Sequence, residues 1–292
     1  MSAVETLEAR SAGSVKALST GYDDLDAKLG GGLRGGNLII IAGRPSMGKT
    51  SLAMNIATNV ADAGTPGCVL SLEMSDIELT DRIIASVGRV PLSDVIAGRL
   101  DGESGDRMLI AVEKLRDLPL AIDDQGGLTL FEAVSKARSI RRRNGLGLLV
   151  VDYLQLMAGD GDNRNAQLEP ITRGLKLLAK ELDIPVIVLS QLSRKCEERP
   201  NKRPMMSDLR DSGAIEQDAD VIAFVYRDEQ HSPDSPDKGT AEIIIGKNRQ
   251  GSTGMVRLAY RGELTRFDSL ASDWRPAERD QSFARQKRKG FD

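Results

Sequence analysis

The stretch Gly43-Arg44-Pro45-Ser46-Met47-Gly48-Lys49-Thr50 decides the fold of this 292-residue chain. It fills every fixed position of the phosphate-binding pattern G-x-x-x-x-G-K-[ST]. The apolar, β-branched run at 37–42 comes directly before it and predicts a buried parallel strand. The segment at 51–60 follows it without Gly or Pro and predicts a helix. Strand, glycine loop and helix in this order predict a phosphate-loop fold that binds a nucleotide.

Each part of this stretch has a chemical role in such a loop. Backbone N–H groups and the N-terminus of the following helix face the phosphates. Lys49 adds an ammonium group, and the Thr50 hydroxyl is left to bind Mg²⁺. We therefore expect a nucleoside triphosphate and Mg²⁺ as cofactors. The expected nucleotide-binding residues are Gly43, Arg44, Pro45, Ser46, Met47, Gly48, Lys49, Thr50 and Ser51.

The composition is that of an ordinary globular protein, with 40% hydrophobic and 28% charged residues. No apolar run approaches the length of a membrane span, and the N-terminus lacks the apolar core of a signal peptide. Two cysteines, Cys68 and Cys196, provide no disulfide framework, and a single histidine argues against a zinc site. These features predict a cytoplasmic protein without a membrane partner.

The net charge of −3 does not indicate a nucleic-acid-binding protein, but the distribution of the basic residues is more informative. Basic residues gather at 194–203 and at 285–289, although such runs are most often solvated faces. The chain has only ten aromatic residues (five Phe, four Tyr and one Trp), too few for a base-stacking platform. Any nucleic acid would therefore be held by its phosphate backbone.

Apolar strand patterns alternate with helical patterns along most of the chain, which predicts βαβ units and a mostly parallel sheet flanked by helices. Strands are expected at 68–72, 120–122, 148–151, 186–190 and 221–226, and helices at 76–87, 106–116, 129–143 and 171–182. Runs at 241–246, 255–260 and 264–267 have no helices between them and predict a C-terminal antiparallel hairpin extension. We expect one α/β domain at 18–270, a linker-helix stub or tail at 1–17 and a basic, disordered tail at 271–292.

Three expected strands end in polar side chains. Asp152 follows 148–151 and could hold the Mg²⁺ shell opposite Thr50, although an aspartate there is often only a turn or cap residue. Glu73 ends the second strand, expected one strand over from the phosphate loop. It could accept a proton from an attacking water, or it could cap the helix at 76–87. Gln191 ends a third strand with a neutral amide that could sense the γ-phosphate.

Further motifs follow in a fixed order: SLEM at 71–74, VDYLQLM at 151–157, SQLSR at 190–194, DLRDSG at 208–213, IEQDAD at 215–220 and IGKNRQG at 245–251. Together with the phosphate loop, they closely resemble the ATPase domain of the DnaB-type replicative helicases. The resemblance covers residues about 18 to 270. It implies a RecA-like core and ATP as the nucleotide. It also implies a homo-oligomer, a hexameric ring, and this ring would translocate on single-stranded DNA.

The resemblance also implies roles for particular residues. Glu73 corresponds to the catalytic base, Asp152 to the magnesium-shell acid, and Gln191 to the γ-phosphate sensor. Lys247 and Arg249 lie two residues apart on a strand edge, so both point to one face. They correspond to a pair that reaches the neighbouring subunit's γ-phosphate, with Arg249 as the arginine finger. The plainer interpretation is that they lie at a solvated hairpin tip.

A loop that grips DNA phosphates in the central channel is implied at Arg210, Asp211 and Gly213, where the glycine would let the backbone approach closely. Arg194 and the basic run at 194–203 would supply positive charge to that channel. A primase or a helicase loader is the further partner implied.

The chain departs from the family's pattern in three respects. Asp211 stands where the family usually has Glu, and Pro170 is expected at the start of the helix at 171–182. We expect a chain without the family's N-terminal domain, either an excised ATPase domain or a naturally short protein. Only a stub of the linker helix is expected at 4–10, which weakens the expected ring. Alternatives to a helicase motor are a non-unwinding, DNA-binding or ring-modulating ATPase subunit and a recombinase-like filament.

Overall fold

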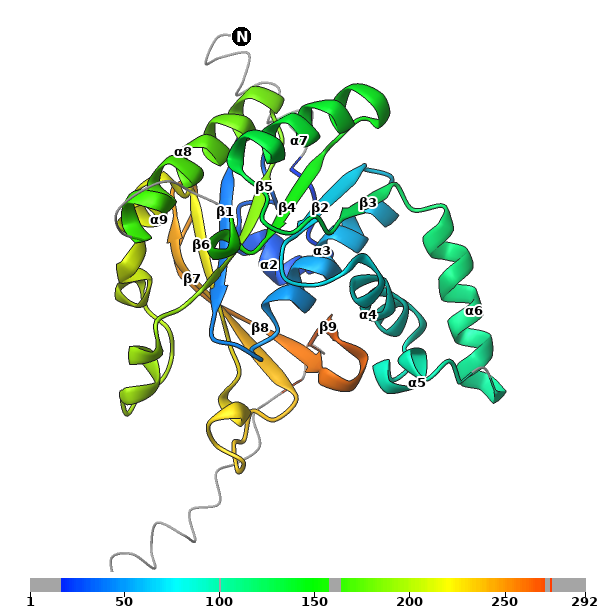
Figure 1. Ribbon diagram of the computed structural model, residues 1–292. Helices are drawn as coiled ribbons and strands as arrows, with labels where there is room; N and C mark the ends of the chain where they lie inside the picture. Colours follow the sequence, from blue (N-terminus) through cyan, green and yellow to red (C-terminus); the bar gives the residue numbers. More distant parts are fainter. Residues whose placement is uncertain (1–16, 100, 158–163, 271–273, 275–292) are drawn as a thin grey trace, which may run out of the picture.

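The computed structural model describes residues 17–99, 101–157, 164–270 and 274 (Figure 1). At 164–166 and 210–212 it describes the backbone alone. The expected helix at 4–10 and nearly all of the expected tail at 271–292 lie outside these residues. No helix within them is long and apolar enough to cross a membrane.

One sheet of nine strands, in the order β3-β2-β4-β5-β1-β6-β7-β8-β9, forms the centre of the fold (Figure 1). The strands from β3 to β6 in this order pair in parallel, and β7, β8 and β9 continue the sheet as antiparallel strands. Their bounds are β1 (Leu38–Gly43), β2 (Gly67–Ser71), β3 (Leu120–Asp123), β4 (Leu148–Asp152), β5 (Val186–Gln191), β6 (Val221–Tyr226), β7 (Thr240–Asn248), β8 (Gly254–Arg261) and β9 (Arg266–Ser269).

Helices cover both faces of this sheet. One face carries α2 (Asp23–Lys28), α3 (Lys49–Asp62) and α4 (Asp76–Gly88), and the other carries α7 (Leu130–Asn144), α8 (Arg164–Leu182) and α9 (Gly213–Asp218). Strand β1 shows why both faces are closed. Ile39 and Ile41 belong to the first hydrophobic cluster, whereas Leu38 and Ile40 belong to the second. A strand buried on both sides needs a continuous apolar run, as in a parallel α/β sheet.

Smaller elements complete the fold. Helices α5 (Leu92–Ile96) and α6 (Gly102–Arg116) extend from α4, and a third apolar cluster that includes Val90, Val95 and Met108 holds them together. Short 3₁₀ turns follow several strands: η1 (Leu154–Leu156), η2 (Arg194–Glu198), η3 (Met206–Ser212), η4 (Asp228–Gln230) and η5 (Gly262–Leu264).

The expected α/β fold with an antiparallel extension is confirmed, with four local corrections. Helix α8 begins at Arg164, so Pro170 lies inside the helix and not at its start. Leu168 and Ile171, on either side of Pro170, are both buried in the second cluster. The third antiparallel strand is β9, after η5, and not 264–267. Gly213, expected in a loop with Arg210 and Asp211, begins the helix α9, and α5 was not expected.

The N-terminus of α7 carries a capping box. The Thr129 hydroxyl accepts a hydrogen bond from the Glu132 N–H, and the Glu132 carboxylate accepts one from the Thr129 N–H. Thr129→Ala should therefore lower the free energy of unfolding by about 1 kcal/mol. Urea unfolding checks this, with Thr129→Ser as the matched control that keeps the hydroxyl. An equal loss for Thr129→Ser would contradict the assignment of the cap.

Candidate active site

The carboxyl ends of the parallel strands gather the expected catalytic residues at one edge of the sheet. Gly43 at the end of β1 is paired in register with Gln191 at the end of β5. Ser71 at the end of β2 is paired with Asp152 at the end of β4, and the Leu72 N–H donates to the Asp152 carbonyl at 2.6 Å. One expectation is wrong: β2 is not next to β1, because β4 and β5 lie between them.

The phosphate loop connects β1 to α3 in a conformation that few residues adopt. Ser46 has a φ of 63° and Gly48 a φ of 96°, so both lie in the left-handed region. At Gly48 a side chain would also be crowded, since a Cβ there would lie 3.2 Å from the Phe267 ring. Helix α3 begins at Lys49, directly after the loop, so its N-terminal N–H groups face the space that the loop encloses.

A hydrogen bond links the loop to the acid of β4. The Thr50 hydroxyl donates to the Asp152 carboxylate at 2.9 Å. Asp152 is buried, and this burial raises its pKa to about 6 despite the opposing effect of the Thr50 hydrogen bond. Burial also lowers the pKa of Lys49. A buried carboxylate beside a hydroxyl oxygen is the donor set that a hard cation such as Mg²⁺ prefers, so these two residues fit that ion.

Glu73 lies in the bend directly after β2 with an exposed side chain. Its charge acts on both Lys49 and Asp152, which places it on the same side of the site. Within the described residues its carboxylate has no hydrogen bond or ion pair. It does not cap α4 either, because Ser75 is the N-cap residue and Glu78 completes the capping box. The carboxylate is therefore available to a water molecule.

Gln191 stands at the tip of β5 with an exposed side chain, and its backbone is fixed by a residue that the sequence did not single out. Gln155 in η1 donates to the Ser190 hydroxyl at 2.9 Å and to the Gln191 carbonyl at 3.3 Å. Its side-chain oxygen accepts from the Gln191 N–H at 3.2 Å. The segment after Asp152 thus holds the strand end that carries the expected sensor.

The Arg44 side chain points out of the phosphate loop. Its Nε donates to Glu197 at 2.8 Å, and its Nη1 donates to the Leu192 carbonyl at 2.8 Å. The expected contribution of Arg44 to the nucleotide is therefore limited to its backbone. Its guanidinium group instead joins the phosphate loop to η2 and to the turn after β5.

A stacked cation–aromatic pair, also not singled out from the sequence, lies against the other side of the loop. The Arg227 guanidinium lies 4.3 Å from the centroid of the Tyr260 ring, and its Nη1 donates to the Ser46 carbonyl at 3.0 Å. Tyr260 in turn packs on Phe267 with ring centroids 4.6 Å apart. The sequence signal was weak, because a lone Arg after β6 and a lone Tyr on β8 are ordinary residues.

Lys247 and Arg249 lie together, as their spacing predicts, although β7 ends at Asn248 and Arg249 is just beyond it. Both hold the C-terminal end of α9: Lys247 donates to the Glu216 carbonyl and Arg249 to the Gln217 carbonyl. Arg249 also lies 3.8 Å from the Asp220 carboxylate. Burial lowers the pKa of Lys247, and the neighbouring Arg249 adds to this effect. None of their contacts among the described residues reaches the phosphate loop.

The expected DNA-binding segment follows β5. Arg194 begins η2, while the side chains of Arg210 and Asp211 lie outside the described part of η3. Gly213 begins α9 with a helical φ of −51°, and a Cβ there would meet nothing within 4 Å, so the chain's own packing does not require a glycine.

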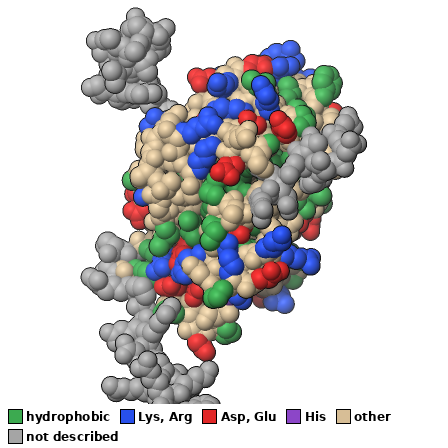
Figure 2. All heavy atoms as spheres, turned by 90° about the vertical axis from the view of Figure 1, so that its left-hand side faces the viewer, with side chains coloured by type: hydrophobic (Ala, Val, Ile, Leu, Met, Phe, Trp, Pro, Cys, Tyr) green, Lys and Arg blue, Asp and Glu red, His purple; other side chains and the backbone are tan. Residues whose placement is uncertain are grey.

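The basic run at 194–203 carries less free charge than its sequence indicates. Arg199 pairs with the buried Asp208 at 2.7 Å, and Arg203 pairs with the buried Glu242 at 2.7 Å. On the face shown in Figure 2, Lys and Arg side chains are interspersed with Asp and Glu. These two arginines therefore stabilise the fold, and Arg194, Lys195 and Lys202 are the remaining cations of the run.

A phosphate loop, an acid hydrogen-bonded to its threonine and an exposed glutamate on a parallel sheet define a phosphate-loop nucleotide-binding domain with a RecA-like fold. Residues 17–269 match the family described as the DnaB-like helicase C-terminal domain, and the chain belongs to that family.

Several proteins of known name or structure are similar to this chain. It is 50% identical over 263 residues to the replicative DNA helicase DnaB of Pasteurella multocida, and 42% identical over 262 residues to that of Geobacillus stearothermophilus. These alignments cover 88% of this chain but 56% and 58% of the relatives, so the chain spans little more than half of their length.

Two solved structures share the fold. One is an ATPase domain, with a TM-score of 0.88 and 37% identity, and the match covers 92% of this chain and 98% of that one. The other is a DnaB-like replicative helicase, solved to show its interactions with primase. It has a TM-score of 0.85 and 38% identity, covering 88% of this chain and 64% of that one.

Proposed function

We propose that this chain is the ATP-hydrolysing motor of a replicative DNA helicase, which translocates on single-stranded DNA and unwinds the duplex. The Thr50–Asp152 hydrogen bond carries the proposal, since it joins the phosphate loop to the acid of β4. Belonging to the DnaB-like family supports DNA as the substrate. A cytoplasmic location, where ATP and chromosomal DNA meet, follows from this function.

The nucleotide would be held from three sides. The N–H groups of the loop and of the first turn of α3 bind the phosphates, and the Lys49 ammonium compensates their charge. Burial lowers the pKa of Lys49, so the negative phosphates help to keep this group protonated. Arg227, which is held by Glu229 and lies over the buried Tyr260 ring, would support the loop at the Ser46 carbonyl.

Residues at the strand ends would divide the hydrolytic work. Mg²⁺, held by Thr50 and Asp152, would neutralise charge that develops on the phosphates. Glu73, whose carboxylate has no partner among the described residues, would take the proton from the attacking water. Gln191 would contact the γ-phosphate through its neutral amide, and Gln155 would fix its position.

Assembly would complete the site. Within one chain, Lys247 and Arg249 hold α9 and do not contact the phosphate loop, so they are proposed to serve the nucleotide of a neighbouring copy. A closed ring, a hexamer in our proposal, provides such a neighbour for every subunit. The related DnaB-like helicase of known structure interacts with primase, and we propose a primase or loader contact for this chain too.

A non-unwinding ATPase subunit remains the second candidate, since Lys247 and Arg249 are held by α9 within the chain. The two candidates differ in strand displacement. Native mass in the presence of an ATP analogue and an oligonucleotide should show a ring, and a forked duplex should then be separated with ATP. An assembled ring that hydrolyses ATP on single strands but leaves the fork intact would favour the second candidate.

Arg210→Ala tests the DNA contact. Binding to single strands should be independent of sequence, with a log–log salt slope near −0.7 per phosphate neutralised. Loss of one phosphate contact should flatten this slope by about that amount, weaken all sequences alike, and remove the stimulation of ATPase by DNA while basal hydrolysis stays. Arg142→Ala, an exposed arginine on α7, is the control. If the affinity for single strands changes neither with salt concentration nor with Arg210→Ala, the DNA-binding surface lies elsewhere on the protein.

A further inference from the structure

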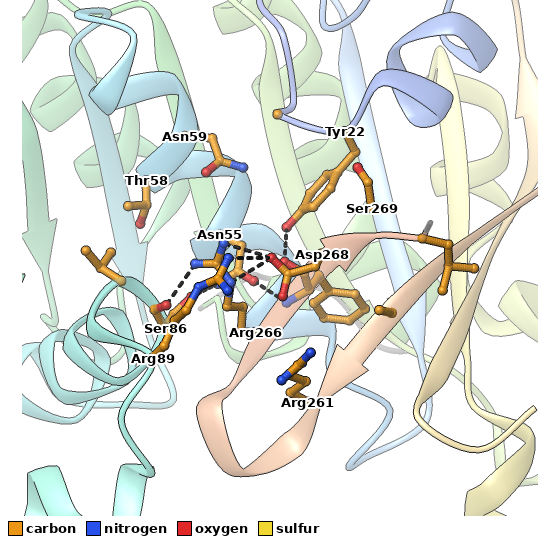
Figure 3. A pocket seen from close by; sticks show the side chains of 15 residues that line it. Tyr22, Asn55, Thr58, Asn59, Ser86, Arg89, Arg261, Arg266, Asp268 and Ser269 are labelled. Atoms are coloured by element: carbon orange, nitrogen blue, oxygen red, sulfur yellow. Dashed lines mark hydrogen bonds and ion pairs between the residues drawn. The ribbon is translucent and has the colours of Figure 1, made fainter. Parts of the chain in front are cut away.

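A pocket of about 620 Å³ opens beside the edge strand β9, away from the phosphate loop (Figure 3). Its walls come from α3, the C-terminal end of α4, the segment before α2, and the β8–β9 end of the sheet. A pocket of this volume is of the size that binds small molecules. None of the residues expected to act on the nucleotide lines it.

Positive charge dominates the lining. Arg89 follows α4, Arg261 ends β8 and Arg266 begins β9, so three arginines come from three separate elements. Asp268 is the one acidic residue among the described lining, which leaves an excess of two positive charges (three minus one). Arg89 occupies the left-handed position after α4, with a φ of 53°, where helices commonly have Gly.

Three neutral side chains of the pocket are already committed to the fold. Asn55 accepts from the Phe267 N–H at 2.7 Å and donates to the Ser86 hydroxyl at 3.1 Å. The Asn59 amide donates to the Thr20 carbonyl at 2.9 Å, and the Tyr22 hydroxyl donates to the Phe267 carbonyl at 3.4 Å. The arginines and the exposed Ser269 hydroxyl are therefore the donors that remain for a ligand among the described lining.

Those donors are only partly used. Arg266 donates to Asp268 at 2.8 Å and to the Ser86 carbonyl at 2.8 Å, so it is largely fixed. Arg89 is 62% exposed and reaches the same Asp268 carboxylate at only 3.9 Å. Within the described structure Arg261 has no hydrogen bond or ion pair. Figure 3 shows Arg89 and Arg266 side by side at Asp268, with Arg261 below them at the end of β8.

We propose that this pocket binds a phosphate-bearing anion between Arg89, Arg261 and Arg266. Guanidinium groups match phosphate oxygens through paired N–H donors, which a single carboxylate such as Asp268 does not saturate. The three arginines in the walls favour a ligand with several charged oxygens. The phosphates of a small polyphosphate and those of a nucleic-acid strand share this chemistry, and the site lies apart from the phosphate loop.

Calorimetry with inorganic tripolyphosphate tests the proposal, with Lys49→Ala protein without Mg²⁺ as the background so that the phosphate loop contributes little. We expect one equivalent to bind, and Arg261→Gln or Arg89→Gln to weaken it roughly ten-fold as one charge-assisted contact is lost. Asp268→Asn should tighten binding, because the competing carboxylate charge is removed. Arg142→Gln on α7 is the matched control and should change nothing.

A second arm titrates a single-stranded oligonucleotide into the same variants. Dependence on Arg89 and Arg261 in either arm supports the site, and the arm that binds more tightly identifies the source of the phosphate. The proposal is overturned if neither ligand depends on these arginines while circular dichroism shows that the variants are folded. Binding of an acidic peptide in place of both phosphate ligands would overturn it as well.

Discussion

Glu73→Gln protein should bind ATP as tightly as the parent but hydrolyse it about 10²–10⁴-fold more slowly, the usual contribution of a general base. Gln keeps the size of the side chain and removes only the ability to take a proton. Because the Glu73 carboxylate has no partner in the described structure, its replacement leaves no buried group unsatisfied. Folding should therefore be unaffected.

Steady-state ATPase and nucleotide-binding measurements check this prediction together. Glu113→Gln, an exposed glutamate on α6, provides a matched control that should retain full turnover. Turnover of the Glu73→Gln protein within a factor of a few of the parent would remove Glu73 from the mechanism. A loss of nucleotide binding would instead indicate a structural role for this carboxylate.

Arg249→Ala should reduce ATP turnover of the assembled protein by about 10³–10⁵-fold if Arg249 acts as an arginine finger. The structure provides a competing explanation, because Arg249 also donates to the Gln217 carbonyl and could act through α9 of its own chain. An experiment that mixes two variant proteins distinguishes action on a neighbouring subunit from action within the same chain. Arg249→Ala and Lys49→Ala subunits should each be inactive alone, but some of their mixed interfaces combine an intact loop with an intact Arg249.

Recovery of ATPase in the mixture, with a maximum at intermediate ratios, is the expected result. Subunits must exchange, which native mass spectrometry verifies. Arg116→Ala on α6 serves as the control for removing an exposed arginine. Activity that stays at the level of the separate variants at every ratio would mean that Arg249 acts within its own subunit or not at all.

The strand ends and the phosphate loop could be predicted because their residues are determined locally. An apolar run followed by a fixed glycine pattern requires a strand and then a helix, and β6 has the bounds expected from its sequence. The order of the strands could not be obtained this way. Glu73 was expected one strand from the loop, whereas two strands intervene, since order in a parallel sheet depends on crossovers and not on any local pattern.

Contacts between segments that are distant along the chain also could not be predicted from the sequence. The basic run at 194–203 was treated as free charge, yet Arg199 and Arg203 are held by Asp208 and Glu242. Glu242 lies 39 residues after Arg203, and no sequence pattern predicts that these two side chains form an ion pair. The same holds for Arg227 and Tyr260, which meet only because β6 and β8 approach the loop in three dimensions.

The hydrogen bonds of Asn55 and Tyr22 have a consequence for how copies of this chain can join. An unprotected outermost strand is a template on which another chain can add a strand, which leads to open-ended aggregation. At β9 the outward-facing N–H and carbonyl of Phe267 are already occupied by these two side chains. Another copy of the chain therefore cannot add a strand at Phe267, so the β9 edge of the sheet is protected there against open-ended extension.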